Sequence, residues 1–174
     1  MIYFQSKYLA EKCNINLAKW KRWTREFLPP DPLGGLRSGY ARQFSHKDAF
    51  RVFLAGYLVS ALKFSVPEAK QILLDLDTWL KKQGLFALPN NKIGRPVTVF
   101  YHIFIFQPDE GRFVYAIKST NQASPFECNR HQVEQGDVTI IGSPGFCFDP
   151  DAMFSARMLL ITGLYHTFLK LIHG

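Results

Sequence analysis

The chain has few cysteines, and the three that it has lie far apart in the sequence. Cys13, Cys128 and Cys147 are odd in number and widely spaced, which argues against a disulfide scaffold and fits a reducing cytoplasm. The first twenty residues carry several charged side chains, so no secretory signal is expected. Internal repeats and low-complexity tracts are also lacking. These features exclude a disulfide-rich secreted module and predict a cytoplasmic globular protein.

The sequence also lacks the groupings that are typical of catalytic sites. His102, His131 and His166 have no nucleophile or paired carboxylate at a telling spacing, and no phosphate-cradling loop is found. The segment 142–145 is interpreted as a turn, because Pro144 has no N–H to offer to an oxyanion hole. We therefore predict that the protein is not an enzyme and needs no cofactor.

A metal site has little support from the spacing of its candidate ligands. Cys128 has His131 three residues later, and Cys147 lies on a later expected strand. Soft-metal sites usually contain a closer pair of cysteines, and nothing in the sequence makes these three residues converge. They are kept as weak candidates only, and no metal is predicted.

The chain has a net positive charge of +7, and all of this excess lies in its first half. Of the 174 residues, 1–84 contain 14 Lys and Arg against 7 Asp and Glu, whereas 85–174 contain 7 of each. A net charge held entirely by one half is typical of a polyanion-binding module joined to a neutral domain. The alternative is a solvated basic face with no ligand.

The N-terminal half shows the pattern of a helix-turn-helix. A short helix is predicted over 6–12 and a second over 17–27, with Asn16 as its N-cap and prolines at 29 and 30 ending it. Apolar residues of the second helix recur at spacings of three and four, which places them on one face and leaves its cations outside. Trp20 and Trp23 belong to the apolar face, so core packing is favoured over stacking on bases. A helix of this kind suits the DNA major groove.

Two further helices and a β-rich half complete the predicted organisation. Turn-forming residues fill 29–44, a helix follows over about 47–62 after a cap at Ser45, and Ser65 caps another that reaches about Gln83. Beyond a linker at 85–96, strands are expected at 97–106, covered on both sides, and at 113–118, 137–141 and 146–148, with a turn at 107–111 and a polar loop at 119–136. A last helix is expected from Asp149 or Asp151 to about His173.

The predicted fold class is therefore α+β, with two domains. Residues 1–84 form a mostly helical winged helix-turn-helix, and 97–174 form a small antiparallel β domain, for oligomerisation or effector sensing, closed by a long C-terminal helix.

Residues 6–73 resemble the DNA-binding domain of the MerR family of bacterial transcription regulators. The resemblance rests on Lys21-Arg22-Trp23-Thr24-Arg25-Glu26 in the recognition helix and Gly39-Tyr40-Ala41-Arg42-Gln43-Phe44-Ser45 at the end of the wing. The starts of the third and fourth helices, 45–48 and 62–68, match as well. It implies a winged helix-turn-helix that binds duplex DNA. The long coiled-coil helix of that family, expected after the fourth helix, is replaced here by a linker and strands.

The residues predicted to contact DNA come from the second helix and the wing. Lys19 is the best candidate for contacting a base edge, because it lies near the start of the helix, whereas the other helix cations are assigned to phosphates. In the wing, the arginines are expected at the backbone or the minor groove. The full set is Asn16, Lys19, Lys21, Arg22, Arg25, Arg37, Tyr40 and Arg42.

Self-association is predicted for the last helix, because the dimer helix of the MerR family is absent. Apolar residues follow one another at spacings of four and three, as in a coiled-coil seam. A membrane span is disfavoured because charged and polar residues interrupt a short run. The predicted seam consists of Phe154, Met158, Ile161, Tyr165, Phe168 and Ile172.

These features favour a sequence-specific transcription regulator that binds double-stranded DNA, as a homodimer on an inverted repeat. A small-molecule effector is left open. One alternative is an excisionase-like or architectural accessory protein that bends DNA and has no effector. Another is an effector-sensing protein whose basic domain no longer binds DNA.

Overall fold

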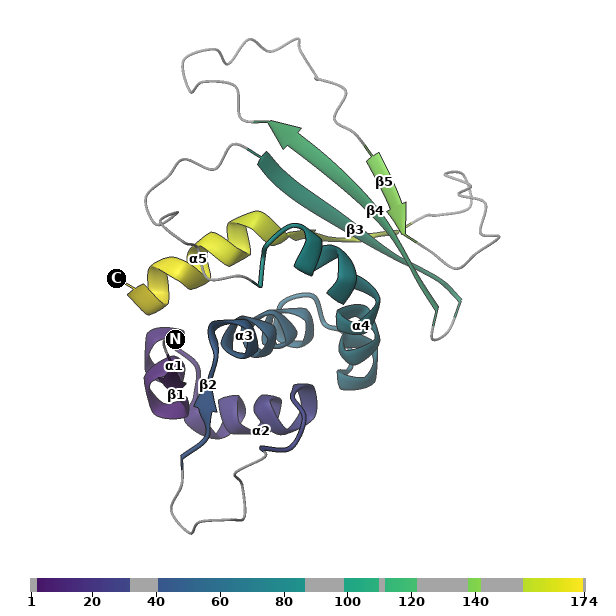
Figure 1. The fold of residues 1–174 in the computed structure, drawn as a ribbon. Coiled ribbons are helices and arrows are strands. Elements are labelled where there is room, and N and C mark those ends of the chain that lie inside the picture. Colours follow the sequence, from purple (N-terminus) through teal and green to yellow (C-terminus); the bar gives the residue numbers. More distant parts are fainter. Residues whose placement is uncertain are drawn as a thin grey trace. The chain divides into compact units, whose positions relative to one another are not determined.

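The computed structural model describes residues 3–31, 41–86, 99–109, 112–121, 138–141 and 155–173, and they form an α+β fold (Figure 1). The chain divides into two compact units. The first comprises Met1–Ile93 together with Tyr165–Gly174, and the second comprises Gly94–Leu164. The predicted fold class is thus confirmed. The units differ from the predicted domains, because the first unit extends to Ile93 and also contains the end of the chain.

The first unit begins with the predicted helix-turn-helix. Helix α1 (Ser6–Lys12) and helix α2 (Leu17–Phe27) are joined by a turn in which Asn14 adopts a φ of 52°. Asparagine tolerates this left-handed conformation better than most residues. The side chain of Asn16 caps α2 by accepting hydrogen bonds from the backbone N–H groups of Ala18 (2.9 Å) and Lys19 (3.4 Å). The predicted bounds of both helices are confirmed.

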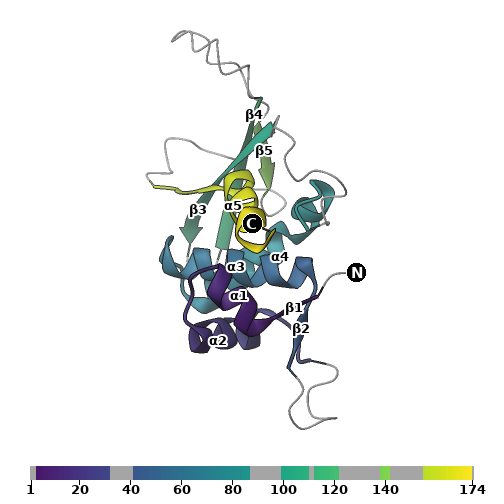
Figure 2. The same cartoon turned by 90° about the vertical axis from the view of Figure 1, so that its left-hand side faces the viewer.

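A small two-stranded sheet lies beside these helices (Figure 2). Strand β1 (Phe4–Gln5) pairs antiparallel with strand β2 (Gln43–Phe44), so the end of the turn-rich segment is held by the N-terminus. From the sequence, this turn-rich segment could form either a loop or two short strands, and its pairing with the N-terminus was not predicted. Residues 32–40, which carry most of the predicted wing, lie outside the described residues.

Helices α3 (His46–Ser60) and α4 (Val66–Lys82) follow, each with the cap that the sequence predicts. Ser65 and Glu68 form a reciprocal capping box, in which Glu68 accepts from the backbone N–H of Ser65 at 2.7 Å. At α3 the shorter Asp48 accepts from the Ser45 hydroxyl at 2.6 Å instead. Leu85 and Phe86, predicted to begin the linker, are buried in the structure. The remainder of the predicted linker, 87–96, lies outside the described residues.

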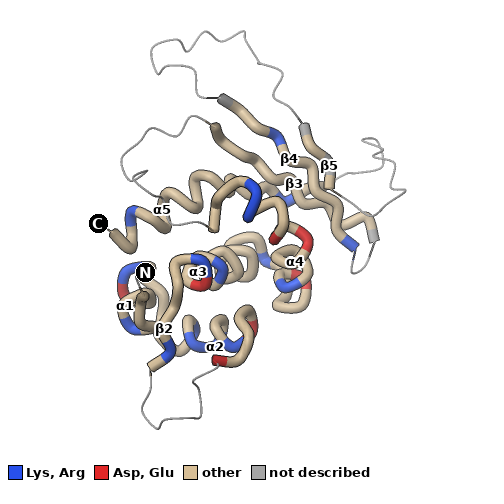
Figure 3. Tube along the Cα trace, viewed as in Figure 1, with Lys and Arg blue, Asp and Glu red and all other residues tan. Residues whose placement is uncertain are grey.

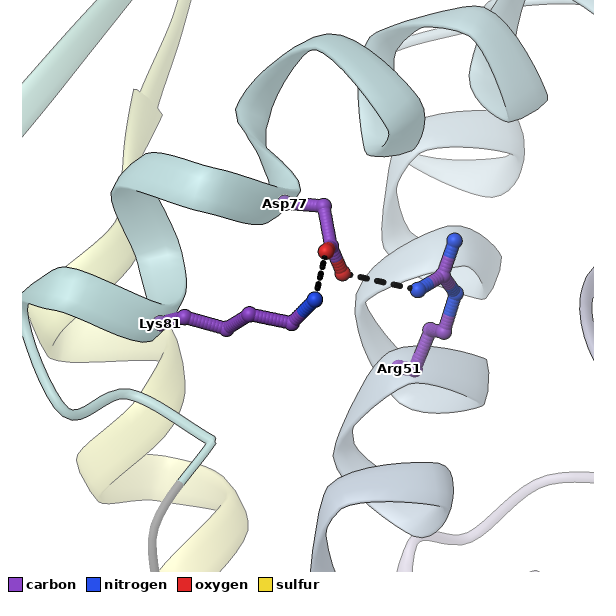
Figure 4. Close-up of polar contacts among 3 residues, drawn as sticks. All are labelled: Arg51, Asp77 and Lys81. Atoms are coloured by element: carbon purple, nitrogen blue, oxygen red, sulfur yellow. Dashed lines mark hydrogen bonds and ion pairs between the residues drawn. The ribbon is translucent and has the colours of Figure 1, made fainter.

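A three-residue ion-pair network joins α3 to α4 (Figure 4). Asp77 of α4 accepts from Arg51 of α3 at 2.9 Å and also pairs with Lys81 one turn along its own helix. Burial alone would raise the pKa of Asp77, but the hydrogen bond from Lys81 and the charge of Arg51 outweigh it and lower that pKa. The network therefore holds an ionised carboxylate between the two helices.

The second unit is built on a four-stranded antiparallel sheet of order β5-β4-β3-β6. Its strands are β3 (Val99–Asp109), β4 (Arg112–Asn121), β5 (Val138–Ile141) and β6 (Arg157–Leu160). Five consecutive residues of β4, from Phe113 to Ile117, are buried, so this strand is covered on both sides. On β3, in contrast, Ile103 and Ile105 are buried whereas Phe104 and Phe106 are half-buried. The prediction that the first strand is covered on both sides therefore fits β4 better than β3.

The turn and loop predicted around these strands start later than expected. Strand β3 continues through Pro108 to Asp109, with a break in register after Phe106, and β4 continues to Asn121. The pairing of the two strands outweighs the local turn preference of proline and of the polar residues after Ile117. The strand predicted at 146–148 lies outside the described residues.

The last helix is shorter than predicted. Residues 157–160 form strand β6, which pairs with β3, and helix α5 (Ile161–His173) begins only afterwards. Leu159 is buried while Met158 and Leu160 are exposed, which is the two-residue alternation of a strand. The start of α5 is held to β3 by the backbone N–H of Tyr101, which donates to the Thr162 hydroxyl at 2.9 Å.

The predicted dimer seam is wrong for the residues that the structure describes. Ile161, Tyr165, Phe168 and Ile172 are all buried within the single chain. The apolar spacing of α5 reflects intrachain packing, since Phe168 and Tyr165 face aromatic rings of α3. Met158 belongs to β6, and Phe154 lies outside the described residues.

Within the described ranges, no helix is long and apolar enough to cross a bilayer. The C-terminal helix α5, for which the sequence analysis considered a membrane span, has 13 residues. This is fewer than the roughly 20 that a bilayer requires.

A glycine sets the distance between α2 and α3. A Cβ atom at Gly56 would overlap the Trp23 indole, with Cε3 at 2.5 Å and Cη2 at 2.6 Å. Alanine is favoured over glycine in a helix by about 1 kcal/mol, so an open site would be stabilised by the substitution. We expect Gly56→Ala instead to lower the free energy of unfolding by about 1–3 kcal/mol through overpacking, measured by urea denaturation.

The double variant Gly56→Ala/Trp23→Phe provides the matched control. Its smaller ring should leave room for the methyl group, so the two substitutions should together cost less than the sum of their separate costs. A Gly56→Ala variant as stable as the parent would contradict this packing.

Candidate nucleic-acid interface

Helix α2 has a buried aromatic face and an exposed cationic one. Trp20, Trp23 and Phe27 are buried, which confirms the prediction that the tryptophans belong to the core. The helical repeat of 3.6 residues places Arg22 and Arg25 on the opposite face, and both are exposed. Lys19 and Lys21 flank this row and are also exposed. Figure 3 shows the cations along α2.

The acidic residue of α2 is neutralised by the neighbouring helix. Glu26 accepts from the Lys70 ammonium of α4 at 2.8 Å, and this hydrogen bond lowers the pKa of the Glu26 carboxyl. The charge of Glu26 is thus turned toward α4 and is compensated there. The outer face of α2 is left with a net positive charge.

Lys19 is placed differently from the other cations of α2. Its ammonium lies over the Trp23 ring, 4.9 Å from a ring centroid, so the side chain is drawn back along the flank of the helix. A contact of this kind holds a lysine more firmly than open solvent does. The centre of the exposed face consists of Ala18, Arg22 and Arg25, and the sequence prediction did not single out Ala18.

Arg42 is also positioned by an aromatic ring. Its guanidinium lies over Phe44 of β2, 5.7 Å from the ring centroid, and Phe44 in turn meets Trp20 edge to face at 6.1 Å. The base of the predicted wing therefore rests on the same aromatic core as α2. This brings Arg42 into the neighbourhood of the α2 cations, which lie 17 to 23 positions earlier in the sequence.

A hollow of about 640 Å³ lies along one side of α2. Lys21 and Arg25, one turn apart on α2, line it together with Arg42 near β2 and Lys7 of α1. Lys7 also makes a loose ion pair with Glu11 at 4.0 Å. The hollow thus gathers cations from three elements that are separated in sequence.

The rest of the hollow is largely apolar. Leu17 and Leu28 contribute to its walls from the two ends of α2, and Pro29 and Pro30 line it just beyond the helix. Asp31 is the acidic residue among the lining residues. The lining thus combines the four cations, which we call the cationic rim, with leucine and proline surface and with the polar Gln5, Ser6 and Thr24.

The predicted DNA-contacting residues fall into four groups. Lys21, Arg25 and Arg42 meet at the hollow, whereas Arg22 and Lys19 lie outside it on α2. Asn16 serves as the helix cap, and Arg37 and Tyr40 lie outside the described residues. Lys7 was missed, because its place beside α2 depends on the packing of α1 and not on any local motif.

Only one of the three cysteines lies among the residues that the structure describes. Cys13 is buried, and burial raises the pKa of its thiol to about 12, so it remains a neutral apolar group. Cys128, His131 and Cys147 lie outside the described residues. Among the residues that are described, no three His, Cys, Asp or Glu side chains gather as a metal site would require.

Comparison with known proteins adds no family to this geometry: no protein-family model matches the chain, and a search of curated proteins finds no match either.

Proposed function

We propose that the protein is a sequence-specific DNA-binding transcription regulator, with α2 as its recognition helix. The observation that carries the proposal is the exposed row of cations on α2, backed by a buried aromatic face and free of an uncompensated acid. A rigid helix with one cationic face matches the width of the major groove. The resemblance of residues 6–73 to the MerR DNA-binding domain supports the same function.

We assign different tasks to the cations. Lys21, Arg25 and Arg42 surround a hollow beside the helix, where they suit contacts to the sugar–phosphate backbone. Arg22 lies at the centre of the exposed face and Lys19 near its N-terminal end, where side chains can reach base edges. Arg22 is thereby added to Lys19 as a candidate for base contact. Homodimerisation remains part of the proposal, but α5 is no longer the proposed contact.

We expect Lys21→Ala and Arg42→Ala each to weaken binding to specific and to non-specific duplexes alike. Removing one phosphate contact should also reduce the slope of log K against log salt concentration by about one unit. Lys19→Ala and Arg22→Ala should instead reduce the preference for the specific sequence. Fluorescence anisotropy with labelled duplexes over a series of salt concentrations measures both effects.

Lys63→Ala serves as the matched control, because Lys63 lies between α3 and α4, with its ammonium on the carbonyl of Ser60. It removes one charge without touching α2 and should leave the salt slope as in the parent. If the variants at positions 19, 21, 22 and 42 all bind as the parent does, the assignment of α2 as the recognition helix is wrong.

A further inference from the structure

The hollow beside α2 is larger and more apolar than a phosphate contact requires. Its volume of about 640 Å³ lies within the roughly 300–1,000 Å³ typical of small-molecule sites. A backbone phosphate needs donors and positive charge, which the rim supplies. It makes little use of the leucine and proline surface that lines the same hollow.

The cations of the rim are arranged to hold an anionic group at one side of this surface. Lys21 and Arg25 project from successive turns of α2, and Arg42 approaches from β2 with its guanidinium steadied by Phe44. An arginine can bind two oxygens of a phosphoryl group at once, and lysine adds a point charge. Leu28, Pro29 and Pro30 offer apolar surface against which a flat ring can lie.

We propose that this hollow is a binding site for a small phosphorylated molecule with a ring-shaped apolar body, of nucleotide size, and that its occupancy competes with DNA. The phosphoryl group lies among Lys21, Arg25 and Arg42, and the ring lies on the leucine and proline surface. The competition rests on the proposed function, because the same two α2 cations then serve the DNA backbone. The protein would thus release DNA when such a molecule accumulates.

The test compares two probes that share a triphosphate group and differ in the presence of the nucleoside. ATP and inorganic triphosphate are titrated into the full-length protein at physiological salt without divalent cations, by isothermal calorimetry. Burial of the ring should make ATP bind at least about tenfold more tightly than triphosphate. Lys21→Ala and Arg25→Ala should each weaken the binding of ATP about tenfold, as expected for the loss of a charged hydrogen bond.

Matched controls lie on the same helix. Lys19→Ala and Arg22→Ala remove the same kinds of charge from α2 but lie outside the hollow, so their binding of ATP should stay within about twofold of the parent. Equal binding of ATP and triphosphate, or equal losses in all four variants, would show attraction by charge alone and overturn the proposal.

A second arm separates this inference from the proposed function. Labelled duplex bound to the parent should be displaced by ATP and far less by triphosphate. If duplex binds but ATP neither binds nor displaces it, the hollow serves the backbone of DNA alone and the inference is wrong, while the proposed function stands. If ATP binds in the hollow but no duplex binds at all, the site is supported and the proposed function fails.

Discussion

Replacing Phe168 with alanine should cost about 3–5 kcal/mol of the free energy of unfolding, the range measured for buried phenylalanines. Phe168 is fully buried, and its ring lies 5.2 Å from Phe53, 5.4 Å from Phe50 and 5.6 Å from His46. The substitution therefore leaves a cavity where α5 meets α3. Urea denaturation followed by far-UV circular dichroism measures the loss.

The neighbouring Thr167→Ala variant is the control, because Thr167 is exposed on the same turn of α5. It should change the free energy of unfolding by no more than about 0.5 kcal/mol. A Phe168→Ala variant that is as stable as the parent but has lost self-association in light scattering would contradict the intrachain packing. It would restore the coiled-coil seam that the sequence suggested.

Acidification should destabilise the protein through His46. This side chain is buried at the start of α3, against Tyr165 and Phe168 and stacked on His173. Neither of its ring nitrogens has a hydrogen-bond partner among the described residues. Burial, and to a smaller degree the charge of His173, lower the pKa of His46 from 6.5 to about 4.

The sign of the effect follows from the lowered pKa. Below pH 6.5 the unfolded chain takes up a proton at this position, but the folded protein does so only near pH 4. The free energy of unfolding is therefore unaffected above this window and falls as the pH drops through it. We expect a total loss of about 3 kcal/mol, of which about 2 kcal/mol is lost between pH 7 and pH 5.

Denaturation of the parent and of His46→Phe at pH 7 and pH 5 isolates this contribution. The phenylalanine keeps an aromatic ring at the site but cannot be protonated, so its stability should depend less on pH. His166 adds a smaller effect of the same sign in both proteins, because burial and then Lys170 lower its pKa. Identical pH dependence in the two proteins would show that protonation of His46 does not cause the loss of stability.

The helices of the first unit could be predicted from the sequence because their signals are local. Asn16, Ser45 and Ser65 each mark a helix start by a side chain that caps the helix they precede. The apolar spacing of α2 likewise placed its cations on the exposed face. The cationic candidate site was therefore visible before the structure, with the exception of Lys7.

The features that the sequence did not reveal depend on contacts between distant residues. Strand β6 lies within an apolar run whose spacing of three and four also suits a helix, and only its pairing with β3 distinguishes the two. The chain returns to the first unit at Tyr165. Tyr165 and Phe168 are therefore core residues of that unit and not part of a dimer seam. The spacing of apolar residues correctly predicts an apolar helix face. It does not predict whether that face packs against the same chain or against a second copy.

The proposed function requires that the cationic face of α2 binds specific DNA sequences. Selection of fragments from a genomic DNA library by the full-length protein, followed by sequencing of the bound fraction, tests this most directly. We expect fragments that share a short motif, and this motif should be lost in the Lys19→Ala/Arg22→Ala variant. Fragments that are bound without a common motif would indicate an architectural role, and a bound fraction no different from the input library would contradict DNA binding altogether.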